Sequence, residues 1–354
     1  MSYSLQEAGE LVIRAGKELL ASGLIARTWG NISARISDSQ FLITPSGMAY
    51  DNLRPEDLVV VGIQDGSWEG SVKPSSEKGV HAAAYRQRPD VNFVLHTHQD
   101  YATALSVLGR DFVFRISEAG YEPEGRRRAS DLIGPVVPTA AYALSSTKKL
   151  TGNLEECIWR YPSSRAFLMR NHGTLILGRD FDEAFAAARV LESVCRKKYI
   201  SLTGEDYPER AQTDGDHTHV IREREEAGCF IETNDPFIVK MSSYGETMRA
   251  YVDDLAQMTG AVIECLSSQT AFEEAAGKLN GGCRAFLVKG RGAVCAARSE
   301  DDALALASVL AKGCQAALLN RTGNRAYPVG RLHAALEHLV YTKKYSKIKD
   351  RQDD

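Results

Sequence analysis

An internal repeat is the feature that most limits the folds open to this 354-residue chain. Residues 165–177 read RAFLMRNHGTLIL, and residues 284–296 read RAFLVKGRGAVCA. Each segment has two apolar runs around a glycine-containing turn, and each is followed by an acidic helix start, at residues 182–184 and 301–303. A duplicated and diverged domain explains this match, and chance similarity of two strand–loop–helix units is the alternative.

Strand and helix patterns alternate along the first 200 residues, which predicts a three-layer α/β/α architecture. Apolar runs typical of strands lie at 32–36, 40–44, 58–62, 91–99 and 166–170. Helical spacing of apolar residues occurs at 6–22, 77–87, 101–108, 148–160 and 181–199. The first two predicted strands are joined by a short polar turn, as in a hairpin, so we expect a mixed or antiparallel central sheet.

The length of the chain predicts two domains. Residues 203–235 are rich in Gly, Asp, Glu and Thr, which is typical of a linker. We therefore predict a first domain at 1–205, a linker or excursion at 206–235, and a second domain at 236–354 that repeats part of the same fold.

The composition is that of an ordinary globular protein, with 44% apolar and 25% charged residues. The net charge of −3 favours neither nucleic acid nor an anionic membrane as a partner, and no apolar run reaches the ~20 residues of a bilayer span. Glu7 and Glu10 interrupt the N-terminal apolar residues, so we do not expect a signal peptide. Seven cysteines without a CxxC pair predict reduced thiols and a cytoplasmic location, and any metal is expected to use histidines and carboxylates.

His96 and His98 end an apolar strand. Residues i and i+2 of a strand face the same side, so both imidazoles can converge on one metal ion. The second H-x-H, His217 with His219, lies in a polar stretch and is expected to be a solvated loop.

Two further segments could complete such a site. His172 follows a strand and precedes Gly173, so it could approach a metal closely, although a hydrogen-bonded surface histidine is the alternative. Glu77 lies at a predicted helix start, where a carboxylate is either a structural partner of the helix dipole or a proton-transfer group beside a metal.

Three turns carry small hydrogen-bond donors, at Gly30-Asn31, at 44–47 and at Ser75-Ser76. Each taken alone is a plain turn or a helix cap. Taken together, they offer the backbone and hydroxyl donors that a phosphate group needs.

The remaining candidates are expected to be structural or solvent-exposed. His81 lies on an alanine-rich helix face and is interpreted as structural. We expect His333 and His338 to be surface or interface residues. The basic residues 126–128 are expected in a solvated loop, with steering of a substrate phosphate as the alternative.

The segments GNIS, TPSG, SSE, HTHQDYATA and RNHG occur in this order, and with them the chain resembles the class II aldolase/adducin family over about residues 5–200. This family includes zinc-dependent fuculose-phosphate and rhamnulose-phosphate aldolases and ribulose-phosphate 4-epimerase. The resemblance implies a class II aldolase-like domain, and it implies a C4 tetramer with the site between neighbouring subunits.

Matched residue by residue, the resemblance implies zinc ligands at His96, His98 and His172 and a catalytic acid/base at Glu77. The phosphate contacts that it implies are Gly30, Asn31, Thr44, Gly47, Ser75 and Ser76.

The sequence departs from the family pattern in two places. Aligning FRISEAG places Phe114 where the aldolases carry a tyrosine from a neighbouring subunit, and Tyr121 is a nearby substitute. In the second repeat Gly290-Arg291-Gly292 replaces Asn171-His172-Gly173, and arginine cannot be a zinc ligand. The second domain is therefore expected to be a degenerate, metal-free aldolase-like region.

These implications predict an aldehyde-lyase of the aldolase type that acts on a small phosphorylated ketose through a metal-bound enediolate. The expected cofactor is Zn²⁺, with another divalent metal as the alternative. Sugar-phosphate epimerisation, decarboxylation and dehydration are alternative reactions, and a non-catalytic adducin-like interaction protein is an alternative of another class. We expect a homo-oligomer, either a dimer of two-domain chains or a tetramer.

Overall fold

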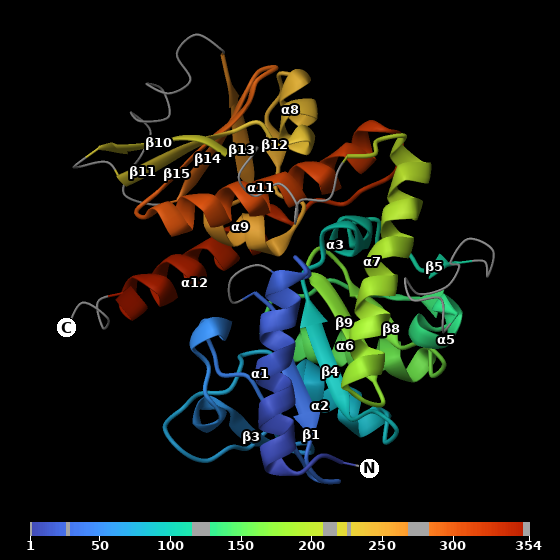
Figure 1. Cartoon of the computed structure of the whole chain (residues 1–354). Coiled ribbons are helices and arrows are strands. Elements are labelled where there is room, and N and C mark those ends of the chain that lie inside the picture. Colours follow the sequence, from blue (N-terminus) through green and yellow to red (C-terminus); the bar gives the residue numbers. More distant parts are fainter. Residues whose placement is uncertain are drawn as a thin grey trace. The chain divides into compact units, whose positions relative to one another are not determined.

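The computed structural model describes residues 2–25, 29–114, 128–207, 218–224, 228–267 and 283–349. It divides the chain into two compact units, Met1–Lys198 and Tyr199–Asp354 (Figure 1). The boundary lies after Lys198, whereas we predicted it after residue 205.

A seven-stranded sheet lies at the centre of the first unit, in the order β3-β2-β1-β4-β9-β8-β7. Neighbouring strands are antiparallel except for β7 and β8, which are parallel, so the predicted mixed sheet is confirmed. Its strands are β1 (Asn31–Arg35), β2 (Gln40–Ile43), β3 (Val59–Gly62), β4 (Phe93–Thr97), β7 (Thr139–Ala140), β8 (Ala166–Met169) and β9 (Gly173–Gly178). A separate pair is formed by β5 (Phe112–Val113) and β6 (Val136–Val137).

Helices cover both faces of this sheet (Figure 1). They are α1 (Leu5–Ala21), α2 (Lys78–Gln87), α3 (Asp100–Ser106), α5 (Ala129–Ile133), α6 (Lys148–Arg160) and α7 (Phe181–Thr203). Ser4 begins α1 as an N-cap that accepts the Glu7 N–H, and Thr147 begins α6 in the same way.

Two successive residues of β4 show why the sheet has a helical layer on each side. Val94 packs into the core cluster that contains Tyr85 of α2 and Leu154 of α6. Its neighbour Phe93 faces the other way, and its ring centroid lies 5.5 Å from that of Phe181 in α7. Both β4 side chains are fully buried, as expected for a central strand between two layers. The three-layer α/β/α prediction is confirmed.

The second unit contains a six-stranded sheet in the order β10-β11-β15-β14-β13-β12. Its strands are β10 (Thr218–Arg224), β11 (Gly228–Thr233), β12 (Met248–Arg249), β13 (Val262–Leu266), β14 (Arg284–Val288) and β15 (Gly292–Ala297). Its helices are α8 (Pro236–Ser243), α9 (Asp253–Thr259), α11 (Glu300–Arg321) and α12 (Arg331–Lys349).

The strand register shows that the second unit repeats part of the first. The hairpin β8–β9 closes with Met169 opposite Gly173, and the hairpin β14–β15 closes with Val288 opposite Gly292. In both units one parallel strand, β7 or β13, flanks the hairpin on the same side. The predicted second partial repeat is confirmed.

Part of the segment 206–235, which we predicted to be a linker or excursion, forms strand β11. Strand β11 pairs with β15 from Cys229 opposite Ala297 to Thr233 opposite Ala293, so it belongs to the second sheet. The apolar residues of β11 are few, and polar residues on both sides dominate the composition of the segment. The composition of the segment therefore did not indicate strand β11.

Helix α11 is long and apolar enough, by length and composition, to cross a membrane. However, 83% of its apolar window is buried within the protein, as in the core helix of a folded domain. The sequence had indicated no such run.

Candidate metal centre and proton-transfer site

Strand β4 and the residues after it place two imidazoles side by side. The Nδ1 atom of His96 lies 2.8 Å from the carbonyl oxygen of Thr174. A carbonyl only accepts, so Nδ1 donates and Nε2 keeps a lone pair for a metal. The Nε2 atom of His98 lies 3.0 Å from this His96 Nε2.

The third imidazole comes from the turn between β8 and β9. Asn171 has a left-handed backbone with φ of 61°, and its N–H donates to Ser106 Oγ at 3.1 Å, which holds the turn. The next residue is Gly173, where a larger residue has no room. A Cβ at this position would lie 2.6 Å from the Thr97 carbonyl oxygen and 3.1 Å from the His98 ring. The glycine therefore lets His172 approach the pair on β4.

The three histidines form one buried cluster. Their ligand atoms all lie within 4.8 Å of one another, and His96, His98 and His172 are at most 5% exposed. Three converging imidazoles are typical of a catalytic zinc site, in which a fourth position stays open. Across the described ranges, no other group of three His, Cys, Asp or Glu side chains converges in this way.

Glu77 bridges two of these histidines from the N-terminus of α2. Its Oε2 lies 3.1 Å from His96 Nε2, and its Oε1 lies 3.0 Å from His172 Nε2. Burial raises the pKa of Glu77, but the positive charge of the protonated His172 and His96 and their hydrogen bonds outweigh burial, and the carboxyl pKa lies well below its ordinary value. Glu77 is thus an ionised carboxylate beside the cluster.

The predicted phosphate turns lie next to one another. The Thr44 N–H donates to the Ile32 carbonyl at 3.1 Å, beside Asn31, and the Ser75 N–H donates to the Thr44 carbonyl at 3.0 Å. Gly30 lies against β4, because a Cβ there would be 2.7 Å from the His96 carbonyl oxygen. The structure therefore brings the three turns to the side of the histidine cluster.

The hydroxyls of these turns differ in accessibility. Thr44 Oγ1 is buried and accepts the Ile32 N–H at 3.3 Å, and Ser75 Oγ accepts the Glu77 N–H at 3.2 Å. Gly47 and Ser76 are exposed. The Ser146 hydroxyl donates to Ser76 Oγ at 2.9 Å, and sequence reasoning had not connected these two residues.

Asn31 and His81 lie directly behind Glu77. Asn31 Nδ2 donates to Glu77 Oε2 at 3.2 Å, and Asn31 Oδ1 lies 2.5 Å from His81 Nε2. His81 is completely buried. Its position four residues after Glu77 on the same helix was the available signal, and we had interpreted it only as a structural residue.

The other sequence candidates lie elsewhere or outside the described residues. Phe114 stacks on Phe112 with ring centroids 6.3 Å apart. His338 donates from Nδ1 to the Gln257 carbonyl at 2.7 Å within the second unit. The candidates outside the described residues are Tyr121, Arg126, Arg127 and His217.

Comparison with known proteins identifies the family of both units. The family described as "Class II Aldolase and Adducin N-terminal domain" matches residues 10–199 and, a second time, residues 210–318. The chain belongs to the class II aldolase and adducin family. The family domain therefore occurs twice in this protein.

Curated relatives from this class II aldolase and adducin family catalyse different reactions on sugar phosphates. A 5-deoxy-D-ribulose 1-phosphate aldolase of Bacillus thuringiensis is 34% identical over 190 residues, which are 53% of this chain and 82% of that protein. A 5-methylthioribulose-1-phosphate/5-deoxyribulose-1-phosphate aldolase of Rhodospirillum rubrum is 32% identical, over 54% of this chain and 80% of that protein. A methylthioribulose-1-phosphate dehydratase of Methylococcus capsulatus is 31% identical, over 52% of this chain and 89% of that protein.

The second class II aldolase unit has other residues at the register positions of the ligands. His96 pairs with Leu175 on β9, two residues after the hairpin glycine, and Glu232 pairs with Val294 at the same place on β15. By the same register, Asn234 takes the position of His98. Arg291 precedes Gly292 as His172 precedes Gly173.

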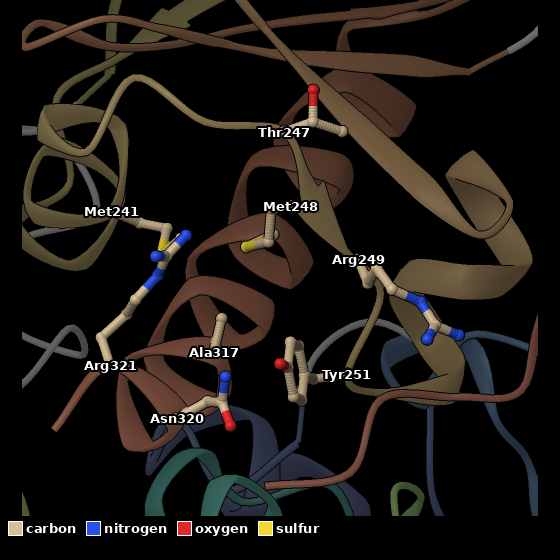
Figure 2. A pocket seen from close by; sticks show the side chains of 8 residues that line it. All are labelled: Met241, Thr247, Met248, Arg249, Tyr251, Ala317, Asn320 and Arg321. Atoms are coloured by element: carbon tan, nitrogen blue, oxygen red, sulfur yellow. The ribbon is translucent and has the colours of Figure 1, made fainter. Parts of the chain in front are cut away.

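The second aldolase unit also contains a pocket of about 200 Å³ (Figure 2). Arg321 forms an ion pair with Glu246 at 2.5 Å, and Arg249 donates to the Val329 carbonyl at 2.7 Å, so both cations serve contacts within the unit. The residues that line the pocket are Met241, Thr247, Met248, Arg249, Tyr251, Ala317, Asn320 and Arg321. They include no histidine, cysteine or carboxylate.

Proposed function

We propose that the first unit is the catalytic domain of a metal-dependent lyase of the aldolase type, and that its substrate is a small phosphorylated ketose. The observation that carries this proposal is the Glu77 carboxylate, held 3.1 and 3.0 Å from the Nε2 atoms of His96 and His172. A carboxylate placed beside three convergent imidazoles combines a metal-ligand set with a proton acceptor.

His96, His98 and His172 would hold zinc or another divalent metal. The bound metal supplies Lewis-acid stabilisation of the negative charge that develops on substrate oxygens. The chain supplies the proton transfer: Glu77, kept ionised by its surroundings, accepts a proton from the substrate and returns it.

The turns at Gly30-Asn31, Thr44–Gly47 and Ser75-Ser76 would bind the substrate phosphate. Their adjacency and the exposed positions of Gly47 and Ser76 support this role. Ser146, which donates to Ser76, is an additional candidate.

Dehydration, decarboxylation and epimerisation are the alternative reactions for the same site. Phe114 stands where the aldolases carry a tyrosine, which removes one proton donor for the leaving aldehyde, and a relative of similar identity is named a dehydratase. A non-catalytic, adducin-like role is disfavoured by the intact histidine cluster.

We further propose a cytoplasmic homo-oligomer, either a dimer of two-domain chains or a tetramer, that uses neither nucleic acid nor a membrane as a partner. The second unit would contribute to assembly and not to metal chemistry, because Glu232, Asn234 and Arg291 replace the three ligands in register.

The experiment that tests the proposal is a panel of phosphorylated ketoses and hydroxy acids, incubated with zinc-loaded protein and with the Glu77→Gln variant. We expect a carbonyl product from at least one ketose phosphate and strongly reduced turnover by the variant. Equal turnover by both proteins would contradict the proposal, as would a zinc content near zero after metal loading.

A further inference from the structure

A series of hydrogen bonds, buried except for the half-buried last one, runs through the first unit and ends on Glu77. Its links are Tyr85 Oη to Ser33 Oγ at 2.8 Å, Ser33 Oγ to His81 Nδ1 at 2.7 Å, His81 Nε2 to Asn31 Oδ1 at 2.5 Å, and Asn31 Nδ2 to Glu77 Oε2 at 3.2 Å. The residues come from β1, from α2 and from its N-cap Glu77. The function proposed above uses Glu77 for proton transfer and Asn31 in the phosphate turn, and it gives no role to the other three residues.

The donor and the acceptor of each hydrogen bond in this series can be assigned. The Glu77 carboxylate only accepts, so Asn31 presents its NH₂ group to Glu77 and its oxygen to His81. An amide oxygen also only accepts, so His81 carries its proton on Nε2.

The protonation state of His81 Nδ1 follows from that of Nε2. Burial, with a smaller contribution from His96, lowers the pKa of His81 to about 3, so the imidazole is neutral and holds a single proton. Nδ1 is therefore an acceptor for the Ser33 hydroxyl, and Ser33 Oγ accepts in turn from Tyr85. Burial raises the pKa of Tyr85, which keeps this donor protonated.

We propose that His81 is a positioning residue that locks the Asn31 amide in the orientation that donates to Glu77. This inference rests on the proposed role of Glu77. If the amide rotated by half a turn, its oxygen would face the Glu77 carboxylate and its NH₂ group would face the Nε2–H of His81. Both contacts would then be repulsive inside a buried site, where such an error costs most.

The inference adds a role for the side chain of Asn31. The resemblance implied Asn31 as a phosphate contact, and the two ends of its amide also contact His81 and Glu77. One N–H of the amide serves the carboxylate, and the second N–H and the backbone of Gly30-Asn31 stay with the turns proposed for the phosphate.

The direct test is the tautomer of His81, measured by long-range ¹H–¹⁵N NMR of histidine-labelled full-length protein and assigned by loss of the signal in His81→Phe. We expect a single Nε2–H tautomer in the parent protein. Asn31→Leu and Ser33→Ala should each weaken this preference, because each removes one of the two partners that impose it. An Nδ1–H tautomer in the parent protein, or a preference unchanged in both variants, would overturn the inference.

The kinetic test uses the substrate found in the panel above. His81→Phe should lower kcat roughly tenfold, about the effect of one hydrogen bond, with KM and zinc content unchanged. His81→Gln, which keeps a donor near the place of Nε2, should restore most of kcat, and His338→Phe in the second unit is the matched control.

The positioning role would be overturned if kcat of His81→Gln were as low as that of His81→Phe. It would also be overturned if His81→Phe raised KM by the same factor by which it lowers kcat. If His81→Phe does not fold, the comparison of His81→Gln with Ser33→Ala gives the same answer, with Ser33→Ala the slower variant. If no ketose phosphate is turned over, the proposed function fails, while the NMR result still decides the inference.

Discussion

The hairpins β8–β9 and β14–β15 close with the same register, yet only the first one presents a metal ligand. Met169 faces Gly173 across the first hairpin as Val288 faces Gly292 across the second. The turn of the first carries His172, and the turn of the second carries Arg291. The backbone of the repeat is therefore kept by packing, whereas the chemistry depends on single side chains at the turn.

The two sheets differ in the same way at the strand beside the hairpin. In the first unit β4 provides His96 and then His98, whereas β11 provides Glu232 and is followed by Asn234. The core residues at equivalent positions stay apolar, with Phe167, Leu175 and Leu177 in one unit and Phe286, Val294 and Ala296 in the other. The folded sheet depends on the apolar core residues, which both units keep. The metal site depends on the histidines, which only the first unit has.

Removing the ligand from the first hairpin should have the largest effect. His172→Ala takes away one of three zinc ligands, and even outer-shell partners of a metal contribute ~10–100-fold to its affinity, so we expect a loss beyond ~100-fold and activity at the metal-free level. Arg291→Ala in the second hairpin should leave zinc content and activity unchanged. Zinc titration and elemental analysis of both variants would measure this, and two zinc ions per parent chain would contradict the comparison.

Glu77 and Glu232 form the next pair, because Glu77 lies beside His96 and Glu232 stands at the register position of His96 in the second unit. Glu77→Gln keeps the size of the side chain but cannot accept a proton, so turnover should fall by ~10²–10⁴ with zinc retained. Glu232→Gln should have no effect on turnover. Steady-state rates of the two variants at saturating substrate separate the two roles.

The two hairpin glycines should respond differently to alanine. At Gly173 a Cβ would lie 2.6 Å from the Thr97 carbonyl and near the His98 ring, so Gly173→Ala should cost ~1–3 kcal/mol and also weaken zinc binding. At Gly292 a Cβ would lie 2.1 Å from the Thr233 carbonyl, and the backbone φ of 134° already disfavours alanine. Gly292→Ala should therefore destabilise the protein and leave zinc affinity intact, which thermal unfolding and zinc titration would show together.

The buried His81 gives the first unit a pH dependence of stability. Its pKa is lowered from 6.5 to about 3 on folding, so between these values the unfolded chain binds one more proton. The contribution of His81 to the free energy of unfolding is then constant above pH 6.5. It falls as the pH is lowered below 6.5, by at most ~1.4 kcal/mol per pH unit. His81→Phe should remove this slope in urea titrations at several pH values, and His338→Phe should keep it. An unchanged slope in His81→Phe would show that other groups cause it.

The smallest effect is expected at Ser76, which is exposed and accepts from Ser146. Ser76→Ala should raise KM for a phosphorylated substrate by about tenfold or less, the value of one hydrogen bond, and should leave KM for the dephosphorylated sugar unchanged. Equal effects on both substrates would point to a different anion in these turns.

The order of helices and strands in the first unit could be predicted because it depends on local patterns. The helix predicted at 148–160 is α6, Lys148–Arg160, and the helix predicted at 6–22 is α1, Leu5–Ala21. The strands β10 and β11 were missed because polar flanking residues outweigh their few apolar positions. A local pattern fails where the partner strand, here β15, supplies the stabilisation.

The sequence by itself determined the candidate ligands. His96 and His98 share one strand face by the two-residue period, and His172 follows a strand and precedes Gly173. Only the tertiary structure decided which residues support these ligands by hydrogen bonds. Asn31, Glu77 and His81 meet only when β1 pairs with β4 and α2 packs over the sheet. Asn31 and Glu77 are 46 residues apart in the chain, and no local period relates them. Hydrogen bonds act over about 3 Å, so a shift of one residue in the strand register would remove them, and that register is a property of the folded sheet as a whole.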